Sequence, residues 1–496
     1  MASLEKYFDR YRHNIIGLEQ DFVTPYGKKR ILYADWVASG RLYKPIEDIL
    51  SRDIAPYVGN THTETNVTGT TMTMAYHYAL SIIKKHVRAG QSDVIISSNS
   101  GMTGVVNKFQ RILGLKLHEK FEPYVKLPET ERPVVFVTHM EHHSNQTTWL
   151  ETIADLELIG ATPEGLVDLQ HLQYLLDKYS ARATKIAAVT SCSNVTGVFT
   201  PYHEIAGIMH RNGGLCFVDF AASAPYIDIN MHPDDEYQYL DAIYFSPHKF
   251  LGGPGSSGIL VFNANLYKNR VPDHPGGGTV LWTNPWGEHK YIDNIEIRED
   301  GGTPAFLQTM KAALAVRLKE SMGTGFITKR EEEILGIIWQ DLFSIPGLHI
   351  LAGSQRQRLG VISFYIDGLH YNLGVKLLND LYGIQVRGGC HCAGTYGHYL
   401  LDVTWETSKN ITETISRGNL SLKPGWIRLS IHPVMTDSEI HYIMDAIKDI
   451  AANYSKYNAD YDYIAEKNEF VHKLDRGTER TMAQSWFDVC DFLKKR

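Results

Sequence analysis

The chain has few cysteines, no long hydrophobic run and no large excess of charge of either sign. Five cysteines among 496 residues are too few for a disulfide framework, so we expect a protein of the reducing cytoplasm. No apolar run approaches the roughly 18 residues of a membrane span, and residues 1–14 are too charged for a secretory signal. The net charge of -7, without a basic region, argues against nucleic acid or anionic membrane as a partner.

Internal repeats and low-complexity tracts are also missing. The length of 496 residues is sufficient for two or three domains with a large core. With 43% hydrophobic and 21% charged residues, the composition is that of an ordinary globular protein.

Short apolar runs alternate with helical patterns over residues 46–330. The runs predict strands at 93–98, 134–138, 185–191, 215–220, 242–246 and 258–262. The segments between them predict helices that include 73–88, 101–114, 169–180 and 203–212. This alternation predicts an α/β fold with a mainly parallel, doubly wound sheet, in which ligands bind at the carboxyl ends of the strands.

The same patterns divide the chain into four parts. We expect an N-terminal segment over 1–45 that contributes to the small domain, a large domain over 46–330, a small domain over 331–451 and a C-terminal helical extension over 452–496. A long helix near 306–342 is predicted to lead into the small domain. In that domain we expect strands at 361–366, 384–387 and 426–431, and helices near 373–382 and 436–451.

Two further segments are expected at the periphery. The charged, proline-containing segment 118–132 is typical of a surface insertion. A final helix is predicted over Met482–Lys495.

Lys249 follows the buried run Ala242–Phe245 and precedes a glycine-rich turn. An amine at the end of a buried strand has a lowered pKa when the site is apolar and other cations are near, which makes it a nucleophile. The alternative is an ordinary surface lysine in a loop.

Two motifs point to groups that hold a charged ligand. Asp219 ends the apolar run Leu215–Val218, where a carboxylate can pair with a cationic ring nitrogen or cap a helix. The segment Ser98–Gly104 follows a predicted strand and opens a helix, as in a phosphate cradle, although many loops have this composition. Ser246 and His248 could add donors to the same phosphate.

The histidine-rich run His139–Asn145 follows another strand, where a flat imidazole can stack on a ring. The run matches none of the H-E-x-x-H, H-x-x-E-H and H-x-E…P-C-x-x-C zinc patterns, so no metal site is predicted. A structural role for these histidines remains an alternative.

Gly253–Gly258 matches the G-x-G-x-x-G pattern of dinucleotide-binding proteins. The pattern must open a helix, whereas the residues that follow here, Gly258–Phe262, predict a strand. We therefore interpret these glycines as a tight turn and not as a nicotinamide site.

A second glycine-flanked segment, Arg387–Gly394, contains Cys390, His391 and Cys392. His391 and Arg387 could favour a nucleophilic thiolate as cationic or hydrogen-bonding neighbours. The alternatives are an incidental buried cysteine, a strained disulfide between Cys390 and Cys392, and a metal site, for which a second cysteine pair is missing.

Arg428 lies inside a strand pattern, where a guanidinium needs a carboxylate partner. It forms either a structural ion pair or a fork for a substrate carboxylate, and Arg387 is a second candidate for the same role.

Together these motifs resemble the class V, fold-type I enzymes that use pyridoxal 5'-phosphate (PLP), and within them the cysteine desulfurase and selenocysteine lyase branch. The resemblance covers most of residues 30–450. It is carried by Tyr33–Ser39, Gly59–His62, Met140–Asn145, Ser193–Gly197, Val218–Ala221, Ser246–Lys249, Gly301–Pro304 and Arg387–Ala393. It implies a large domain with a seven-stranded, mainly parallel sheet and a smaller α+β domain.

The resemblance also implies roles around the cofactor ring. Lys249 would bind PLP covalently and act as the base at the substrate α-carbon, and Asp219 would hold the pyridine nitrogen. His142 would stack on the ring, and Asn194 would lie near the ring oxygen and the substrate.

The phosphate and the thiol have their own implied residues. The phosphate cradle would consist of Gly101, Met102, Thr103, Ser246 and His248. Thr303 would reach the phosphate of a neighbouring subunit, so a homodimer is implied. Arg428 would bind the substrate carboxylate, and Cys392 occupies the position of the persulfide cysteine, whereas relatives commonly have another residue at position 390.

The sequence departs from the family pattern at two places. Ala222 stands where relatives often have glutamine, which removes a donor near the ring oxygen, and Ser223 could substitute. Gly101–Gly104 replaces the commoner Thr-Thr-Glu-Gly, so backbone groups would contribute more to phosphate binding.

The implied function is a desulfurase or selenocysteine lyase that releases alanine and passes sulfur through Cys392 to a sulfur-acceptor protein. One alternative is a class V aminotransferase or other PLP lyase in which Cys392 takes no part. Two others are a molybdenum cofactor sulfurase-like activity and a scaffold without turnover. The sequence does not distinguish cysteine from selenocysteine.

Overall fold

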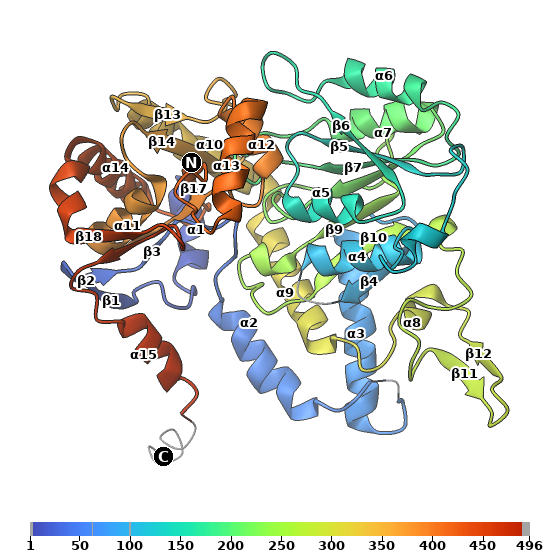
Figure 1. The fold of residues 1–496 in the computed structure, drawn as a ribbon. Coiled ribbons are helices and arrows are strands. Elements are labelled where there is room, and N and C mark those ends of the chain that lie inside the picture. The colour runs from blue at the N-terminus through green and yellow to red at the C-terminus, as the bar shows by residue number, and fades with distance from the viewer. Residues whose placement is uncertain (1–2, 62, 99–100, 489–496) are drawn as a thin grey trace.

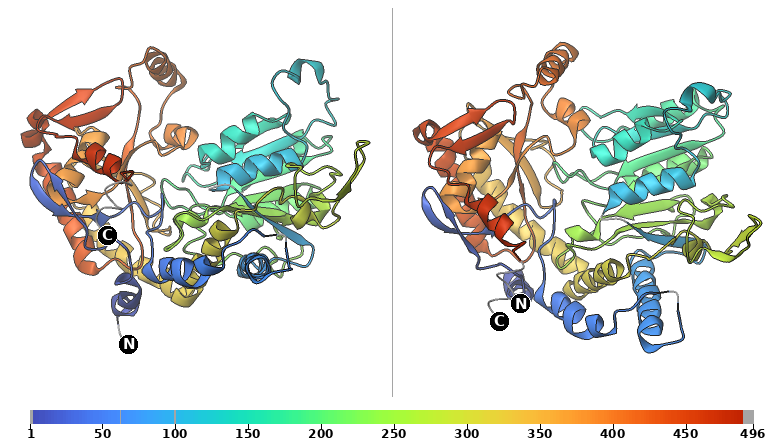
Figure 2. Two further views of the ribbon diagram at one scale, coloured as in Figure 1. Left: turned by 90° about the horizontal axis from the view of Figure 1, so that it is seen from below. Right: turned by 60° about the horizontal axis from the view of Figure 1, so that its bottom comes forward.

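The computed structural model describes residues 3–488 except 62 and 99–100, and it shows two domains side by side (Figures 1 and 2). His62 of the Gly59–His62 motif and Asn99 and Ser100 of the predicted phosphate loop therefore lie outside the described residues. In the described part of the chain, no helix is long and apolar enough to cross a membrane.

The large domain is built on a seven-stranded sheet. Its spatial order is β4 (Asp93–Ser98), β10 (Gly258–Asn263), β9 (Ala242–Phe245), β8 (Leu215–Asp219), β7 (Lys185–Thr190), β5 (Val134–Thr138) and β6 (Asp155–Ile159). The five strands from β9 to β6 are parallel, and β10 runs antiparallel to both of its neighbours. The predicted fold class, with a mainly parallel sheet, is confirmed.

Helices cover both faces of this sheet because successive strand residues point to opposite sides. In β5, Val134 and Phe136 belong to one hydrophobic core, and Val135 and Val137 belong to the other. The first face is covered by α3 (Val67–His86), α6 (Leu169–Lys178), α7 (Tyr202–Arg211) and α9 (Phe306–Met322). The second face is covered by α4 (Met102–Ile112) and α5 (His143–Leu150).

The small domain contains a four-stranded antiparallel sheet. Its order is β13 (Leu348–Ile350), β14 (Val361–Ile366), β17 (Trp426–Ser430) and β16 (Arg387–Gly389). The helices of this domain are α10 (Thr324–Leu342), α11 (Tyr371–Tyr382), α12 (Gly394–Leu400), α13 (Trp405–Ser416) and α14 (Asp437–Tyr457). No residue of α13 is buried, and this helix stands away from the rest of the chain in Figure 2.

The N-terminal segment packs onto the small domain. The strand β3 (Leu32–Tyr33) pairs in parallel with β15 (Ile384–Gln385), and Asp35 forms a β-bridge with Ser430. The segment thereby carries the side chain of Asp35 toward the end of β17, where the two domains meet.

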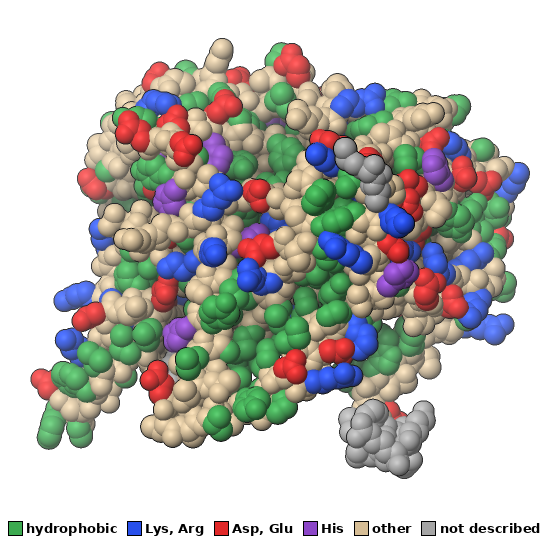
Figure 3. Space-filling model, turned by 180° about the vertical axis from the view of Figure 1, so that it is seen from behind, with side chains coloured by type: hydrophobic (Ala, Val, Ile, Leu, Met, Phe, Trp, Pro, Cys, Tyr) green, Lys and Arg blue, Asp and Glu red, His purple; other side chains and the backbone are tan. Residues whose placement is uncertain are grey.

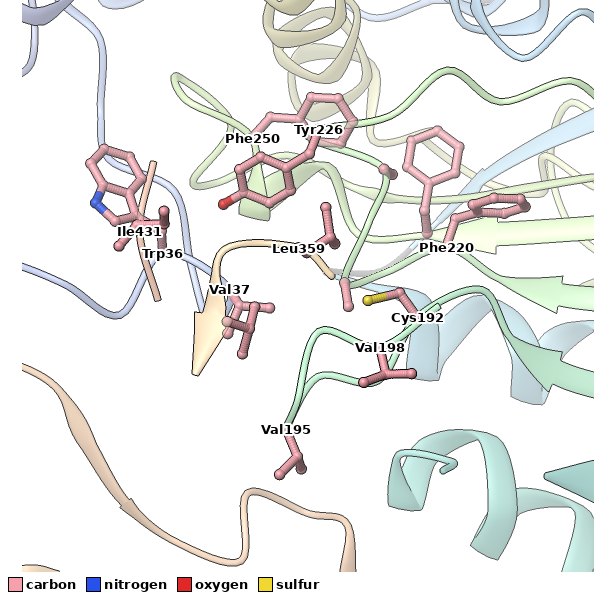
Figure 4. Close-up of a cluster of buried hydrophobic side chains, with 14 of the residues drawn as sticks. Trp36, Val37, Cys192, Val195, Val198, Phe220, Tyr226, Phe250, Leu359 and Ile431 are labelled. Atoms are coloured by element: carbon pink, nitrogen blue, oxygen red, sulfur yellow. The ribbon is translucent and has the colours of Figure 1, made fainter. Parts of the chain in front are cut away.

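A cluster of buried hydrophobic side chains joins the two domains (Figure 4). Trp36 and Val37 come from the N-terminal segment, and Leu359 and Ile431 come from the small domain. They pack with Cys192, Val195, Val198, Phe220, Tyr226 and Phe250 of the large domain. The cluster fixes the small domain against the carboxyl ends of β7 and β8.

The remaining elements are short helices and hairpins, and most of them lie at the edges. The helices are α1 (Leu4–Arg12), α2 (Lys44–Asp48), α8 (Ile295–Arg298), α15 (Thr478–Ser485) and the short η1 (Ile49–Ile54), η2 (Ala55–Tyr57), η3 (Glu122–Tyr124), η4 (Pro247–Lys249), η5 (Ala264–Leu266) and η6 (Asn458–Asp460). The hairpins are β1 (Asp21–Thr24) with β2 (Gly27–Arg30), β11 (Val280–Thr283) with β12 (His289–Tyr291), and β18 (Tyr461–Ile464) with β19 (Glu469–His472). The β11–β12 hairpin projects from the large domain at the lower right of Figure 1.

Several predicted elements need correction. The helix predicted over 306–342 is two helices, because Gly323 adopts a positive φ of 77° that ends α9 and starts α10 in a new direction. The strand predicted at 384–387 is also divided, since β15 pairs with β3 whereas β16 pairs with β17.

The C-terminal tail differs from its prediction as well. Residues 452–457 still belong to α14, which is longer than predicted, and η6 and the β18–β19 hairpin follow. The next helix, α15, starts before the predicted Met482. The end of the predicted helix, from 489 onward, lies outside the described residues. In the predicted insertion 118–132 most side chains are exposed.

Candidate active site

A pocket of about 450 Å³ opens between the two domains at the carboxyl ends of the large-domain strands. Thr303 is the one predicted site residue that does not line it. The large domain contributes Gly101, Met102, Thr103, His142, Asn194, Asp219, Ser246, His248 and Lys249. The small domain contributes Arg387, His391, Cys392 and Arg428.

Lys249 lies in the short helix η4, one turn beyond β9, and its side chain reaches into the pocket. Burial lowers the pKa of its amine from 10.5 to about 8; the charge of Asp219 opposes this shift, and Arg428 adds to it. About a tenth of the amine is therefore unprotonated at pH 7, far more than for an ordinary lysine, and the unprotonated form is the one that acts as a nucleophile or a base.

Asp219 ends β8 and is 3% exposed. Burial raises the pKa of its carboxyl to about 6, although a 2.8 Å hydrogen bond from the Ala221 amide and the charge of Lys249 both lower it. A buried carboxylate of this kind is stabilised by a cationic partner inside the pocket.

His142 forms the N-cap of α5, and its Nδ1 accepts a hydrogen bond of 3.1 Å from the Ser144 amide. Burial and the charge of Lys249 lower the pKa of His142 to about 3, so the ring is neutral at physiological pH. The cap fixes the orientation of a flat, neutral ring on the pocket wall.

The start of α5 is held by the buried carboxylate of Glu141. This carboxylate accepts hydrogen bonds of 2.6 Å from Thr138 Oγ1, 2.9 Å from the Thr190 amide and 2.8 Å from Asn145 Nδ2. Burial raises the pKa of Glu141 to about 7. Glu141 thus joins the ends of β5 and β7 to α5 and keeps His142 in place.

The predicted phosphate loop leads into the N-terminus of α4. Ser246 Oγ accepts a 2.8 Å hydrogen bond from the Met102 amide, the first residue of that helix. A Cβ atom on Gly101 would lie 3.4 Å from Ser246 Oγ and 3.8 Å from the His248 ring. Glycine at this position therefore keeps open a small space that a helix N-terminus makes favourable for an anion.

Arg428 is in β17, with 4% of its side chain exposed, and it forms an ion pair with Asp35. Its Nη2 lies 2.8 Å from Asp35 Oδ1, and Nη1 donates to the Asn194 carbonyl at 3.1 Å. Arg387 Nε contacts the other oxygen of Asp35 at 2.9 Å. The structural ion pair expected as one alternative is therefore present, and it unites both candidate arginines.

Three buried polar atoms along this part of the pocket have no hydrogen-bond partner. They are Arg428 Nε, Asn194 Oδ1 and His391 Nδ1. Arg428 Nε is a donor, whereas Asn194 Oδ1 and the Nδ1 atom of the neutral His391 ring are acceptors. Because unpaired buried polar groups are costly, such a cluster at a pocket wall indicates a polar ligand.

Cys392 is exposed and lies in a turn between β16 and α12. The turn is closed by a 3.1 Å hydrogen bond from the Ala393 amide to the Cys390 carbonyl. Both central residues, His391 and Cys392, have left-handed backbone conformations, with φ of 53° and 56°. This conformation costs about 1–2 kcal/mol for each residue that has a Cβ, so the turn is strained.

His391 is not the cationic neighbour that one sequence interpretation offered. Burial and the charge of Arg428 lower the pKa of His391 well below its ordinary value, so its ring is neutral. Its Nε2 contacts the Arg387 carbonyl at 3.2 Å, which leaves hydrogen bonding as its role.

Two further expectations are corrected. Ser223 does not replace the missing glutamine, because it is fully buried, lies outside the pocket and pairs with Ser191 Oγ at 2.5 Å. Asp35 was part of a recognised motif without an assigned role. A buried carboxylate needs partners, but both of its partners are more than 350 residues away in sequence, so local patterns contain no sign of them.

Among the described residues, no cluster of three or more histidine, cysteine, aspartate or glutamate side chains is suited to hold a metal ion. As expected, Gly253–Gly258 leads into a strand, β10, and not into a helix.

Comparison with known proteins decides the family. The family model described as Aminotransferase class-V matches residues 125–443. The chain belongs to this family. The predicted class V membership is therefore confirmed.

Curated relatives in the family point in the same direction. A protein named probable cysteine desulfurase from Staphylococcus epidermidis is 28% identical over 369 residues, which cover 74% of this chain and 84% of the relative. A protein of the same name from Staphylococcus aureus strain Mu50 is 28% identical over 370 residues, with the same coverage.

Solved structures support the family fold. The cysteine desulfurase of Thermococcus onnurineus NA1 superposes with a TM-score of 0.70 at 21% identity, over 90% of this chain and 98% of that one. The cysteine desulfurase CsdA of Escherichia coli gives 0.69 at 20% identity, with the same coverage.

Proposed function

We propose that the protein is a PLP-dependent cysteine desulfurase that transfers sulfur to Cys392. The observation that carries the proposal is that Lys249 and Cys392 line one pocket, although they come from different domains. The names of the relatives from Staphylococcus support the same activity. Because Cys392 reaches the pocket, the aminotransferase and lyase alternatives, in which it takes no part, are less favoured.

The residues present fit PLP. Lys249 offers an amine for covalent attachment, and the buried Asp219 suits a protonated pyridine nitrogen. The space beside Gly101, with the N-terminus of α4 and the side chains of Ser246 and His248, suits a phosphate. When bound, PLP supplies an electron sink that makes the α-hydrogen of an amino acid removable.

Each residue of the site then has its own role in the reaction. Lys249 takes the proton from the substrate α-carbon, and its lowered pKa suits this role. Asp219 remains anionic beside a cationic ring nitrogen, and the neutral ring of His142 supports one face of the site. The Cys392 thiolate attacks the substrate sulfur, and a new S–S bond forms as the Cβ–S bond breaks, with its electron pair left on the carbon side. The three-carbon remainder takes up a proton at Cβ, regains one at Cα from Lys249 and leaves as alanine.

We assign substrate binding to the polar atoms without partners. Arg428 Nε and Asn194 Oδ1 are available to the carboxylate and the amino group of an amino acid, and Arg387 is exposed enough to turn toward the carboxylate. Because Asp35 offsets only one of the two arginine charges, one positive charge remains, which suits a substrate with a single carboxylate such as cysteine or selenocysteine.

We further propose a homodimer in which Thr303 reaches the phosphate of the neighbouring subunit. Thr303 is exposed and lies outside the pocket of its own chain. Val67, Met74 and Tyr78 are about two-thirds exposed along one side of α3, and Trp286 is 82% exposed at the tip of the β11–β12 hairpin. Figure 3 shows hydrophobic side chains at this tip, at lower left, and over the lower middle of the same face.

We also propose a cytoplasmic location, because the small number of cysteines suits a reducing compartment.

One assay tests the proposal. The purified protein, loaded with PLP, is given L-cysteine or L-selenocysteine with a reductant, and alanine is measured together with sulfide or selenide. We expect alanine in equal amount to the released chalcogen. Turnover that requires a 2-oxo acid would instead support an aminotransferase. Addition of a candidate sulfur-acceptor protein in place of the reductant tests transfer from Cys392.

A further inference from the structure

The two adjacent histidines of the His139–Asn145 run have different surroundings. His142 lines the pocket, whereas His143, the first residue of α5, does not. The side chain of His143 is turned toward the small domain. Its Nε2 accepts a hydrogen bond of 3.0 Å from the amide of Gly394, which is the first residue of α12.

Further bonds join the same parts of the chain. The amide of His143 donates to the Cys392 carbonyl at 2.6 Å, and Asn194 Nδ2 donates to the His391 carbonyl at 2.9 Å. Thr395 Oγ1 donates to Gln146 Oε1 at 2.8 Å. The large domain therefore holds the turn 390–393 by hydrogen bonds to residues both before and after Cys392 in sequence.

These hydrogen bonds act on a strained segment. His391 and Cys392 both hold left-handed conformations that side chains with a Cβ avoid, and neither is glycine. Strain of this kind persists only where surrounding contacts impose it. Without them the turn would relax toward ordinary conformations, and Cys392 would leave its place at the pocket.

We propose that His143 is a positioning residue whose imidazole latches the strained Cys392 turn to α5 and so keeps the thiol facing the pocket. Because the Gly394 amide donates to Nε2, the latch forms only when Nε2 of His143 carries no proton. The consequence for sulfur transfer rests on the proposed function, but the latch itself does not.

Amide hydrogen exchange tests the latch directly, on full-length protein loaded with PLP and without substrate. In His143→Phe, which lacks an acceptor, we expect the segment 388–400 to exchange about fivefold faster, in line with the loss of one hydrogen bond. In His143→Gln, whose amide oxygen can replace Nε2, exchange stays within about twofold of the wild-type protein. If His143→Phe does not fold, His143→Ala, which also lacks an acceptor, is compared with His143→Gln in its place.

A matched control removes another bond between the domains. Gln355 Nε2 donates to the Glu164 carbonyl at 3.2 Å, outside the pocket, so Gln355→Ala should leave exchange of segment 388–400 unchanged. The exchange of β14 reports that the small domain remains folded in every variant. Unchanged exchange in His143→Phe, or equally fast exchange in His143→Gln, overturns the proposal.

Turnover separates this inference from the proposed function. For a desulfurase, His143→Phe should lower kcat about fivefold with little change in KM for cysteine, and His143→Gln should restore kcat. If the wild-type protein forms no alanine, the proposed function fails, whereas the exchange result still decides the latch. A higher KM in His143→Phe, with kcat unchanged, would contradict a role of His143 in positioning the thiol.

Discussion

The two walls of the pocket are built in different ways. On the large-domain wall, Asp219 ends β8, and His142 and Lys249 lie a few residues beyond the ends of β5 and β9. On the small-domain wall, Cys392 sits in a strained turn, and Arg428 depends on Asp35 from the N-terminal segment. The first wall is set by the topology of a sheet, whereas the second is set by contacts between distant segments. Substitutions on the two walls should therefore fail differently.

The largest effect is expected on the large-domain wall. Lys249→Ala should lower alanine formation by at least about 10³-fold, because it removes both the proposed point of covalent attachment and the proposed base. Borohydride should no longer fix PLP to the protein. Lys268→Ala, at an exposed lysine, is the matched control and should retain both properties. Borohydride-fixed PLP in Lys249→Ala would refute the assignment.

Cys392→Ala should impair the function of the small-domain wall and leave that of the large-domain wall intact. We expect alanine formation from cysteine to fall by about 10²-fold or more, with PLP uptake unchanged, since the role proposed for the thiol is attack on the substrate and not binding of the cofactor. Alanine release and PLP binding are measured on the same preparation. Cys390→Ala serves as the control, and undiminished desulfuration in Cys392→Ala would assign the thiol role to Cys390.

Asp35→Asn should reveal how far the small-domain wall depends on its ion pair. Breaking a buried pair leaves Arg428 uncompensated, so we expect the free energy of unfolding to fall by roughly 3 kcal/mol. Glu19→Gln removes an exposed partner of Arg30 and should cost less than about 1 kcal/mol. The two variants are compared by urea denaturation, and equal losses would contradict the buried role of Asp35.

The smallest effect concerns pH. The pKa of Lys249 is lowered to about 8, so the rate of covalent PLP uptake by the apoprotein should rise about tenfold from pH 7 to pH 9 and then level off. Asp219 raises this pKa, and Asp219→Asn should therefore move the midpoint below 8. Stopped-flow absorbance follows the uptake. A midpoint near 10.5, or an upward shift in the variant, would rule out this electrostatic account.

The errors of the sequence-based predictions have a common physical origin. The central strands were found because each is an apolar run, whereas the edge strand β6, with its alternating Asp155–Ile159, was missed. The break at Gly323 was missed because a helical pattern on both sides hides a change of direction. The β18–β19 hairpin was missed since each of its strands is only 4 residues long.

In the candidate site, too, local sequence patterns revealed some residues and missed others. Lys249, Asp219, His142 and the Gly101–Thr103 segment were predicted, since each stands at the end of an apolar run. Asp35 and His143 received no role, because their partners lie far away in sequence. The expectation of a cationic His391 was wrong, since the sequence does not reveal that burial beside Arg428 keeps this ring neutral.

By itself, the sequence determined the α/β fold, the strand ends that carry the reactive groups and the family to which the chain belongs. Those features depend on apolar periodicity and short motifs, which are local properties of a chain. Only the tertiary structure decided that Asp35 pairs with two arginines, that His143 holds the turn of Cys392 and that this turn is strained. Such features arise from contacts between segments far apart in sequence, and a carboxylate or an imidazole acquires its role only from the groups that folding places beside it.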